Sequence, residues 1–376
     1  MRKISDTIGR LESFRVRSGT TTTSPDNGGL TPLENFGTNP GALGAWTHVP
    51  QTAKVPIPLV VVLHGCTQNA RDYNRGAGWS QLADELGFAV LLPEQRRANN
   101  FNLCFNWYEA SDNRRDIGEA ASIKQMVDCM IEKHGIDPSR VFINGLSAGG
   151  AMTSVMLATY PETFAAGAII AGLPYGSANG VPEAFDRMRG HGGPDGPGLA
   201  QLVRAAAPAN GRWPTISVWH GDADYTVAAS NGDNIIEQWR PLHEVSDAPD
   251  VVETVNGYPH RIWLDPNGRA AIRDYRITGM GHGTPLATMG DEACGVSGAH
   301  MLEVAISSTR RIASDWGLGR ADGRKTKPAL DTTRNTFGSP RKQTGPGNTS
   351  TAELTPTTAG RVTKIIEDAL RSAGLM

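Results

Sequence analysis

A serine between glycines is the first feature of this sequence that could do chemistry. The pentapeptide Gly-Leu-Ser-Ala-Gly at positions 145–149 follows the β-favouring run 141–143 and precedes apolar residues at helical spacing, Ala151, Val155 and Ala158. This order predicts a strand, a sharp turn and a helix, with the Ser147 hydroxyl exposed on the turn. Because glycine occupies 44 of the 376 positions, the pentapeptide alone is weak evidence for a nucleophile.

A serine hydroxyl becomes a strong nucleophile only when a histidine takes its proton and a carboxylate orients that histidine. After a turn of this kind the acid comes next along the chain, and the histidine follows it. Residues 215–221 predict an apolar strand that ends in a loop holding two carboxylates, Asp222 and Asp224. Asp224 matches the pattern H-G-x-x-D-x-x-V, which makes it the preferred acid. Asp222 is then expected to cap a turn.

The general base should follow a later strand. Residues 271–277 alternate as a strand does and lead into a glycine-rich stretch that contains His282. Any one of the nine histidines is more often a solvated or core residue than a catalytic one. The order along the chain and the position in an exposed loop favour His282 as the base.

The tetrahedral intermediate of ester hydrolysis needs N–H donors for its oxyanion. One should be the N–H of Ala148, directly after the serine, and the other should come from the loop after a buried strand. The uninterrupted apolar run 57–63 predicts that strand, and His-Gly-Cys follows it at positions 64–66. Cys66 is therefore expected to act through its backbone N–H and not through its thiol.

Five motifs in this order resemble the polyhydroxybutyrate (PHB) depolymerase family of esterases, a branch of the α/β-hydrolases. The resemblance covers about residues 36–316 and implies Ser147 as nucleophile, Asp224 as acid, His282 as base, and Cys66 with Ala148 as oxyanion donors. It is specific for the family and much less so for the substrate. The motifs are Leu63-His-Gly-Cys-Thr-Gln68, Pro93-Glu-Gln95, Cys104-Phe-Asn-Trp107, Gly145-Leu-Ser-Ala-Gly-Gly-Ala-Met152 and Ala171-Gly-Leu-Pro-Tyr-Gly176.

Aromatic residues close to the expected oxyanion loop are candidates for the substrate pocket. Aromatics in such a loop more often cap the core, but Trp107 and Tyr108 would suit an apolar acyl chain. Leu173 and Tyr175 are expected to form another wall. Residues 177–212, rich in Gly, Pro and Ala, are expected to be either a lid or a surface excursion with one helix near 199–206.

Four cysteines do not describe a disulfide-dense scaffold. Cys66 and Cys104 both lie in the family-like motifs, so one bridge between them is possible, but free thiols are favoured in a reducing cytosol. Cys129 is expected to be a small buried hydrophobe. Cys294 has no assigned partner.

From residue 57 onward, apolar strands alternate with helices, which predicts an α/β-hydrolase fold with a mostly parallel central sheet and helices on both faces. Helices are expected at 79–86, 114–131 and 301–316, the last closing the domain. The segments 261–264 and 270–277, joined by a Pro-Asn-Gly turn, predict a hairpin that delivers the His282 loop.

The expected organisation is an amphipathic helix at 1–17, a linker at 18–44, the catalytic domain at 45–319, a disordered linker at 320–360 and a second amphipathic helix at 361–376. Residues 1–17 contain no continuous apolar stretch typical of a secretion signal, so a cytoplasmic location is expected. No run of about 18 apolar residues could span a membrane. A net charge of −2 offers no argument for nucleic acid.

These observations predict a serine esterase that uses no cofactor and no metal, acting on 3-hydroxybutyrate oligomers or polymer and on short-chain esters. The lack of an export signal and of a polymer-binding domain makes oligomers and short esters more attractive than insoluble polymer. A carbohydrate esterase that removes acetyl or feruloyl groups is the enzymatic alternative. The non-enzymatic alternative is a protein of polyester-granule surfaces. The terminal helices are expected to pack on the domain, to pair in a homo-oligomer, or to reach such a granule.

Overall fold

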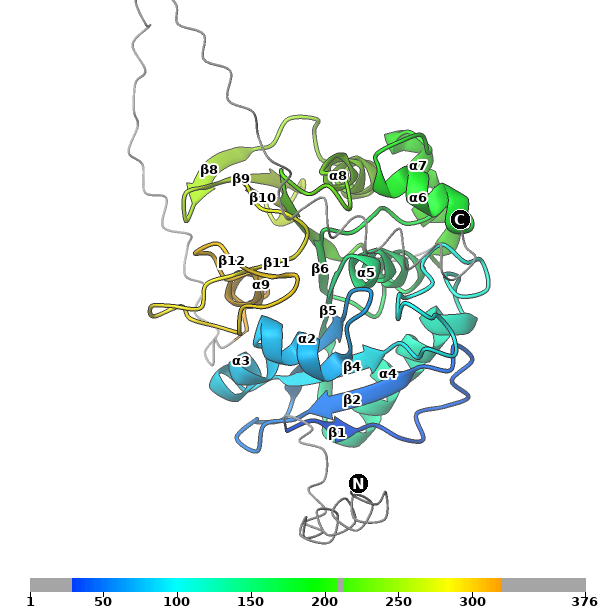
Figure 1. Ribbon diagram of the computed structural model, residues 1–376, viewed down its shortest axis with the longest axis vertical. Coiled ribbons are helices and arrows are strands. Elements are labelled where there is room, and N and C mark those ends of the chain that lie inside the picture. The colour runs from blue at the N-terminus through cyan, green and yellow to red at the C-terminus, as the bar shows by residue number, and fades with distance from the viewer. Residues whose placement is uncertain (1–28, 209–211, 319–376) are drawn as a thin grey trace, which may run out of the picture.

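The central sheet places six parallel strands side by side. The computed structural model describes residues 29–208 and 212–318 (Figure 1). Its ten-stranded sheet has the order β1-β2-β4-β3-β5-β6-β7-β10-β9-β8. The six consecutive strands β4, β3, β5, β6, β7 and β10 are parallel. The strands beyond them, β2 and β1 at one end and β9 and β8 at the other, pair antiparallel. The strands are β1 (Thr31–Pro32), β2 (Gly44–His48), β3 (Ile57–Leu63), β4 (Ala89–Glu94), β5 (Ile136–Leu146), β6 (Ala166–Ile170), β7 (Thr215–Gly221), β8 (Val251–Val255), β9 (Tyr258–Leu264) and β10 (Ala270–Ile277).

The strand β3 shows why the centre of the sheet is parallel and covered on both faces. All seven of its residues are buried. Leu59, Val61 and Leu63 belong to one apolar cluster, whereas Val60 and Val62 belong to another. Because successive side chains of a strand point to opposite faces, the two clusters are the two cores on either side of the sheet.

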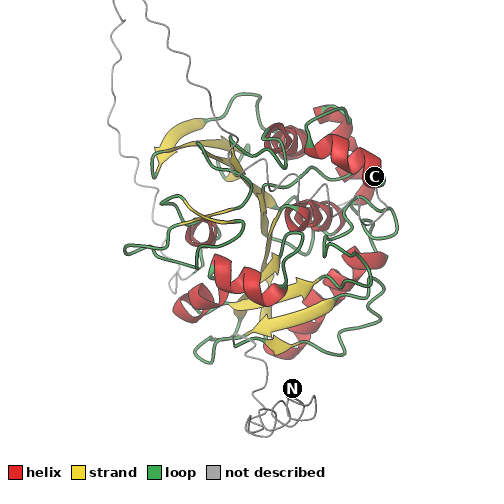
Figure 2. Cartoon of the chain, in the orientation of Figure 1, coloured by secondary structure: helices red, strands yellow, loops and turns green. Residues whose placement is uncertain are grey.

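Helices cover both of these cores (Figure 2). The first core receives apolar side chains from α4 (Gly118–His134), α5 (Ala148–Thr159), α6 (Val181–Met188), α7 (Gly196–Ala206) and α8 (Ser230–His243). The second receives them from α2 (Ala70–Ala77), α3 (Trp79–Leu86) and α9 (Ser308–Asp315). The predicted α/β-hydrolase architecture, a mostly parallel sheet between helical layers, is confirmed.

Several elements lie where the sequence pattern predicts them. Strand β3 and helix α3 have the predicted bounds, and β9 and β10 form the predicted hairpin. Helix α4 begins at Gly118 and not at residue 114, because Ile117 before it has extended backbone angles, and it continues to His134.

The predicted closing helix at 301–316 is wrong in its first half. Met301–Glu303 is a short strand, β12, that pairs in parallel with β11 (Thr284–Leu286). The helix α9 begins only at Ser308, because the Ser307 side chain accepts a hydrogen bond from the Arg310 N–H and so caps the first turn. The apolar spacing at 301–316 therefore suggests one long helix where the structure has a short strand followed by a shorter helix.

The described part of the segment 177–212 (residues 177–208 and 212) contains two helices, α6 and α7, where one was expected. Leu199, Ala200 and Val203 of α7 are buried. Gln238 of α8 donates a hydrogen bond to the Leu199 carbonyl. The α7 part of this segment is thus packed against the body of the domain.

The folded domain begins before residue 45. Leu30, Leu33 and Leu43 are buried, and β1 pairs with β2, so residues 29–44 are part of the domain and not a linker. The helices expected at 1–17 and 361–376 and the linker expected at 320–360 lie outside the described residues. Within the described ranges, no helix is both long and apolar enough to cross a membrane.

Candidate active site

Ser147 lies on a strained turn between β5 and α5. Its backbone angles, φ 58° and ψ −119°, are rare for a residue with a side chain. Its N–H donates to the Ile170 carbonyl of the neighbouring strand, which helps to hold the turn in place. A Cβ at Gly149 would collide with the backbone oxygens of Leu63 and His64, which explains the glycine two residues after the serine. Such strain persists where the surrounding structure over-determines it, and it is common at active sites.

The sheet brings the three candidate catalytic residues to one edge. Strands β5, β6, β7 and β10 are adjacent and parallel, so their carboxyl ends meet at the same edge of the sheet. Ser147 follows β5, Asp224 follows β7 and His282 follows β10. In open α/β sheets, this edge is where ligands bind.

Asp224 and His282 are directly bonded. Nδ1 of His282 donates to Oδ2 of Asp224 over 2.7 Å, and both side chains are almost completely buried. The other carboxylate oxygen, Oδ1, accepts hydrogen bonds from the Thr226 and Val227 N–H groups, each over 2.9 Å. The carboxylate is therefore fixed by its own loop and holds the imidazole with its proton on Nδ1, which leaves Nε2 able to accept a proton.

Asp222, the competing carboxylate, has a different role. Its side chain is exposed and accepts a hydrogen bond from the Gly279 N–H over 2.6 Å. It therefore caps the turn after β10, the role expected for the carboxylate that is not the acid.

A second histidine, which the sequence pattern does not single out as functional, lies next to Asp224. His220 is completely buried, and its Nε2 lies 2.9 Å from the Val227 carbonyl oxygen and 3.4 Å from Oδ2 of Asp224. Burial acts to raise the pKa of Asp224, but the hydrogen bonds and charges of His220 and His282 outweigh it and bring this pKa well below its usual value. The carboxylate consequently stays ionised, as an orienting acid must. The pattern H-G-x-x-D contains His220 and could have suggested its position.

The loop after β3 controls the direction of the Cys66 N–H. The Gln95 N–H donates to His64 Nε2 over 3.1 Å, so His64 carries its proton on Nδ1, which donates to the Gly65 carbonyl over 2.8 Å. Burial lowers the pKa of His64, which favours this neutral form. Since C=O and N–H point in opposite directions across a trans peptide, fixing the Gly65 carbonyl also fixes the Cys66 N–H.

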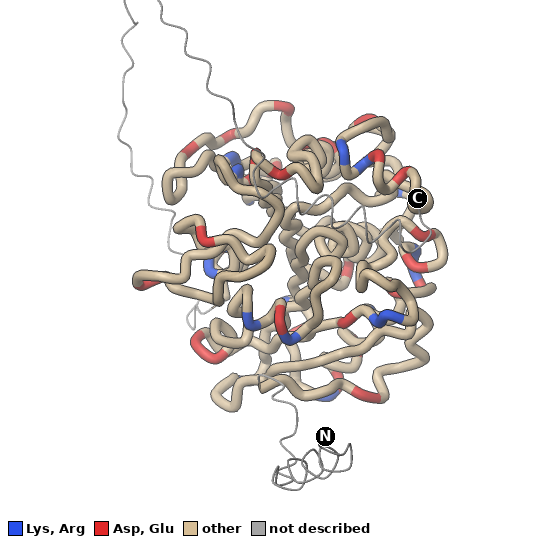
Figure 3. Tube along the Cα trace, in the orientation of Figure 1, with Lys and Arg blue, Asp and Glu red and all other residues tan. Residues whose placement is uncertain are grey.

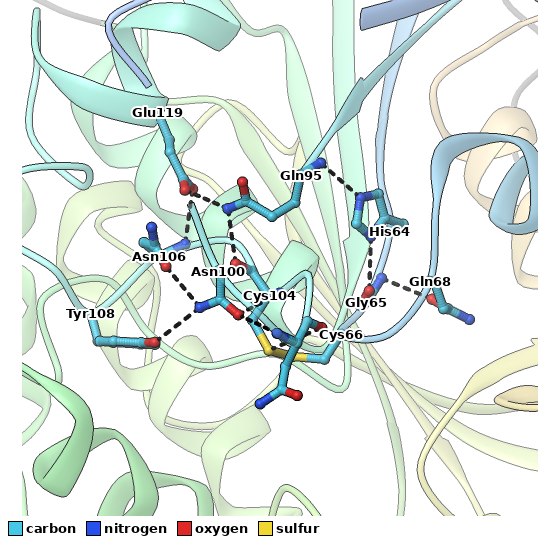
Figure 4. Close-up of a disulfide and its surroundings, with 11 residues drawn as sticks. His64, Gly65, Cys66, Gln68, Gln95, Asn100, Cys104, Asn106, Tyr108 and Glu119 are labelled. Atoms are coloured by element: carbon cyan, nitrogen blue, oxygen red, sulfur yellow. Dashed lines mark hydrogen bonds between the residues drawn. A yellow bond between two sulfur atoms is a disulfide. The ribbon is translucent and has the colours of Figure 1, made fainter. Parts of the chain in front are cut away.

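The Cys66 side chain is joined to Cys104 by a disulfide (Figure 4). Free thiols were the favoured expectation for this pair, so that interpretation is wrong. The fold places the two loops close together: the Thr67 N–H donates to the Asn102 carbonyl over 2.7 Å. The bridge therefore ties the loop that carries Cys66 to the loop that carries Trp107 and Tyr108. Cys129 and Cys294 are free and buried.

The Cys104 loop is held by a buried polar network (Figure 4). Glu119 of α4 accepts hydrogen bonds from Gln95 Nε2 over 2.5 Å and from the Asn106 N–H over 2.8 Å. Gln95 Nε2 also donates to the Cys104 carbonyl. Burial is the main reason why the pKa of Glu119 is raised to about 8, although the hydrogen bonds that it accepts from Asn106 and Gln95 act to lower it.

Two of the four predicted pocket residues, Trp107 and Leu173, belong to the apolar cluster that contains Ala148. They are only 6% and 2% exposed, so little of either side chain could touch a substrate. Tyr108 and Tyr175 are partly exposed and pack against that cluster, which leaves them better placed to contact a substrate. Trp107 and Tyr108 meet edge to face, with ring centroids 5.4 Å apart.

In the described part of the chain, no group of three or more His, Cys, Asp or Glu side chains could hold a metal ion.

Several known proteins that are similar in sequence to this chain are esterases. The family model for esterase PHB depolymerases matches residues 45–255, more than half of the chain. Poly(3-hydroxyalkanoate) depolymerase C of Paucimonas lemoignei is 46% identical over 291 residues, which cover 77% of this chain and 70% of that protein. Acetylxylan esterase of Coprinopsis cinerea is 32% identical over 267 residues (69% and 70%), and feruloyl esterase B of Talaromyces stipitatus is 31% identical over 265 residues (68% and 72%).

A solved structure supports the same assignment of the fold. Acetyl xylan esterase from Aspergillus awamori superposes with a TM-score of 0.62 and 27% identity, covering 67% of this chain and 93% of that one. The matched family model and the 46% identical relative together show that this chain is a carboxylic ester hydrolase and belongs to the PHB depolymerase family of esterases.

Proposed function

We propose that this esterase hydrolyses 3-hydroxyalkanoate esters, above all oligomers of 3-hydroxybutyrate, together with short-chain esters, through an acyl-enzyme on Ser147. The observation that carries the mechanism is the 2.7 Å bond between His282 Nδ1 and Asp224 Oδ2 at the sheet edge where Ser147 lies on its strained turn. The substrate class is supported by the similarity to the poly(3-hydroxyalkanoate) depolymerase of Paucimonas lemoignei.

In this mechanism His282 Nε2 takes the Ser147 proton as the hydroxyl oxygen attacks the ester carbonyl. The Cys66 and Ala148 N–H groups donate to the resulting oxyanion. The tetrahedral intermediate collapses when the protonated His282 gives its proton to the leaving alkoxide. His282 then activates a water molecule, which attacks the acyl-enzyme and releases the acid.

A carbohydrate ester is the second candidate substrate. Relatives at 31% and 32% identity are named as feruloyl and acetylxylan esterases, and the acetyl xylan esterase fold superposes over most of its length. The same serine, acid and base would remove an acetyl or feruloyl group. We expect Tyr108 and Tyr175, which are partly exposed, to influence the choice between these substrates.

A substrate panel tests the proposal. The purified protein is assayed on 3-hydroxybutyrate trimer, amorphous polyhydroxybutyrate, p-nitrophenyl butyrate, acetylated xylan and methyl ferulate, and kcat/KM is compared. The proposal expects the trimer to exceed acetylated xylan and methyl ferulate by at least about tenfold, the discrimination that one or two pocket contacts supply. A preference for either carbohydrate ester would move the assignment to the second candidate.

The location of the enzyme and its binding to polyester granules can both be tested. The Cys66–Cys104 bridge favours an oxidising compartment over the cytoplasm. Thiol trapping in fractionated cells decides between the two compartments, because a cytoplasmic enzyme should carry this cysteine pair reduced.

Polyester-granule binding is tested by deleting residues 1–17 and 321–376: co-sedimentation with granules should fall while soluble-ester hydrolysis stays unchanged. Equal granule binding by the truncated protein would refute the anchoring role.

A further inference from the structure

His300 contacts the candidate base, His282, in two ways. Its Nδ1 lies 3.1 Å from the His282 carbonyl oxygen. The two imidazole rings also meet edge to face, with centroids 5.7 Å apart and an interplanar angle of 77°. Because a carbonyl oxygen only accepts, Nδ1 of His300 carries the proton of this hydrogen bond.

His282 depends on contacts of this kind, because its own chain neighbours do not restrict it. Gly281 precedes it and Gly283 follows it, and neither has a Cβ to limit the backbone angles. Asp224 fixes the ring at Nδ1, but this bond does not itself hold the backbone of His282. The bond from His300 fixes the other end of the residue, at the carbonyl.

His300 is itself rigidly placed. Its φ of 59° lies in the left-handed region that residues with a side chain seldom adopt. Its carbonyl accepts a hydrogen bond from the Thr284 N–H over 2.8 Å, and the pairing of β11 with β12 begins directly after it. The Thr284 hydroxyl lies 3.3 Å from the Tyr73 hydroxyl of α2. The strained backbone is therefore held by the small sheet and, through it, by the body of the domain.

We propose that His300 is a positioning residue for His282: it donates a hydrogen bond to the His282 backbone and abuts its ring, so that Nε2 is aimed at Ser147. The proposal rests on the proposed function and deepens it. A general base that is tilted away from its partner loses rate, and a misplacement of about 1 Å can cost about 10²-fold. Substrate binding relies on other residues, so the loss is expected in kcat and not in KM.

Three substitutions separate the hydrogen bond from the backbone conformation. His300→Gly tolerates the positive φ and removes the side chain. His300→Asn also tolerates this φ, and its amide nitrogen can take the place of Nδ1 as a donor. His300→Asp has the same shape as asparagine but offers only acceptors when ionised.

The variants are compared by kcat and KM on p-nitrophenyl butyrate, by melting temperature, and by the downfield proton NMR signal of the His282–Asp224 hydrogen bond. We expect kcat to fall about 10- to 100-fold in the glycine and aspartate variants, with KM within about twofold, and to recover to within about threefold of the parent in the asparagine variant. The NMR signal should broaden in the first two and persist in the third.

A glycine variant with the parent's kcat and NMR signal overturns the proposal, and so does an asparagine variant as impaired as the glycine one. If the glycine variant does not fold, the asparagine and aspartate variants are compared by the same measurements, and that comparison decides whether His300 positions His282. The NMR signal does not depend on turnover. The positioning role is therefore decided even if an active Ser147→Ala variant shows that the proposed mechanism is wrong.

Discussion

Nδ1 of His282 lies 2.7 Å from Oδ2 of Asp224, although 58 residues separate them in the chain. The bond is possible because β7 and β10 are parallel neighbours, so the loops that follow them leave the same edge of the sheet. It distinguishes Asp224 from Asp222, whose side chain accepts a hydrogen bond from the Gly279 N–H of a turn.

Exchanging the two carboxylates for amides tests this distinction. Asp224→Asn should lower kcat by about 10³- to 10⁴-fold, because an amide no longer stabilises the imidazolium or selects its tautomer. Asp222→Asn should cost less than about tenfold, since it weakens one turn and leaves the bond between Asp224 and His282 in place. Both are measured on a p-nitrophenyl ester. A larger loss at Asp222 would transfer the acid role to that residue.

Removing the nucleophile should abolish hydrolysis and leave the fold intact. Ser147→Ala deletes one oxygen from a turn that is held by backbone contacts. His282→Ala should reduce kcat by about 10⁴-fold or more, because members of such a set act as a unit. Ser154→Ala, on the helix that follows Ser147, is the matched control, since the Ser154 hydroxyl donates to the Gly150 carbonyl of its own helix. Ser147→Ala with activity within a few-fold of the parent would refute the acyl-enzyme mechanism.

The disulfide should contribute to stability more than to chemistry. Cys66→Ala keeps the backbone N–H, so most of the activity on a soluble ester should remain. The bridge closes a loop with a sequence separation of 38, for which chain entropy predicts a loss of about 4 kcal/mol when it is absent. Urea unfolding of Cys66→Ala, Cys104→Ala and the double variant measures this loss. Because either substitution breaks the same bond, the double variant should be no less stable than the single ones; additive losses would argue against the bridge.

Glu119 should make the stability of the domain depend on pH. Burial raises its folded-state pKa to about 8 from an ordinary value of 4.5, so between these two values the folded protein holds a proton that the unfolded chain releases. The stability that comes from Glu119 is fully present below the unfolded-state pKa of 4.5 and is lost as the pH rises through the folded-state pKa of about 8.

Replacing this carboxyl by an amide, which resembles its protonated form, should remove that dependence. The parent is expected to lose stability between pH 5 and pH 8 relative to Glu119→Gln, as measured by urea unfolding at several pH values. Asp128→Asn is a control for charge on the same helix, because Asp128 is an exposed partner of Lys124. Parallel curves for the parent and Glu119→Gln would show that this carboxyl is ionised throughout.

The sequence by itself determined the features that depend on neighbours in the chain. The run of β-branched residues in β3, the helix α3 ending at Gly87, and the strand–turn–helix around Ser147 follow from local preferences and from the close approach that glycine permits. The order of Ser147, Asp224 and His282 also carried enough information to predict three residues that the fold then brings to one edge.

Only the tertiary structure decided which side chains bond across large separations. Composition does not tell whether Cys66 meets Cys104, but two loops that leave neighbouring strands do meet. The apolar spacing at 301–316 fits one helix until the pairing of β12 with β11 converts its beginning into a strand. That pairing also carries His300 to His282, a contact invisible in the sequence because hydrogen bonds between distant segments depend on where the sheet places their backbones.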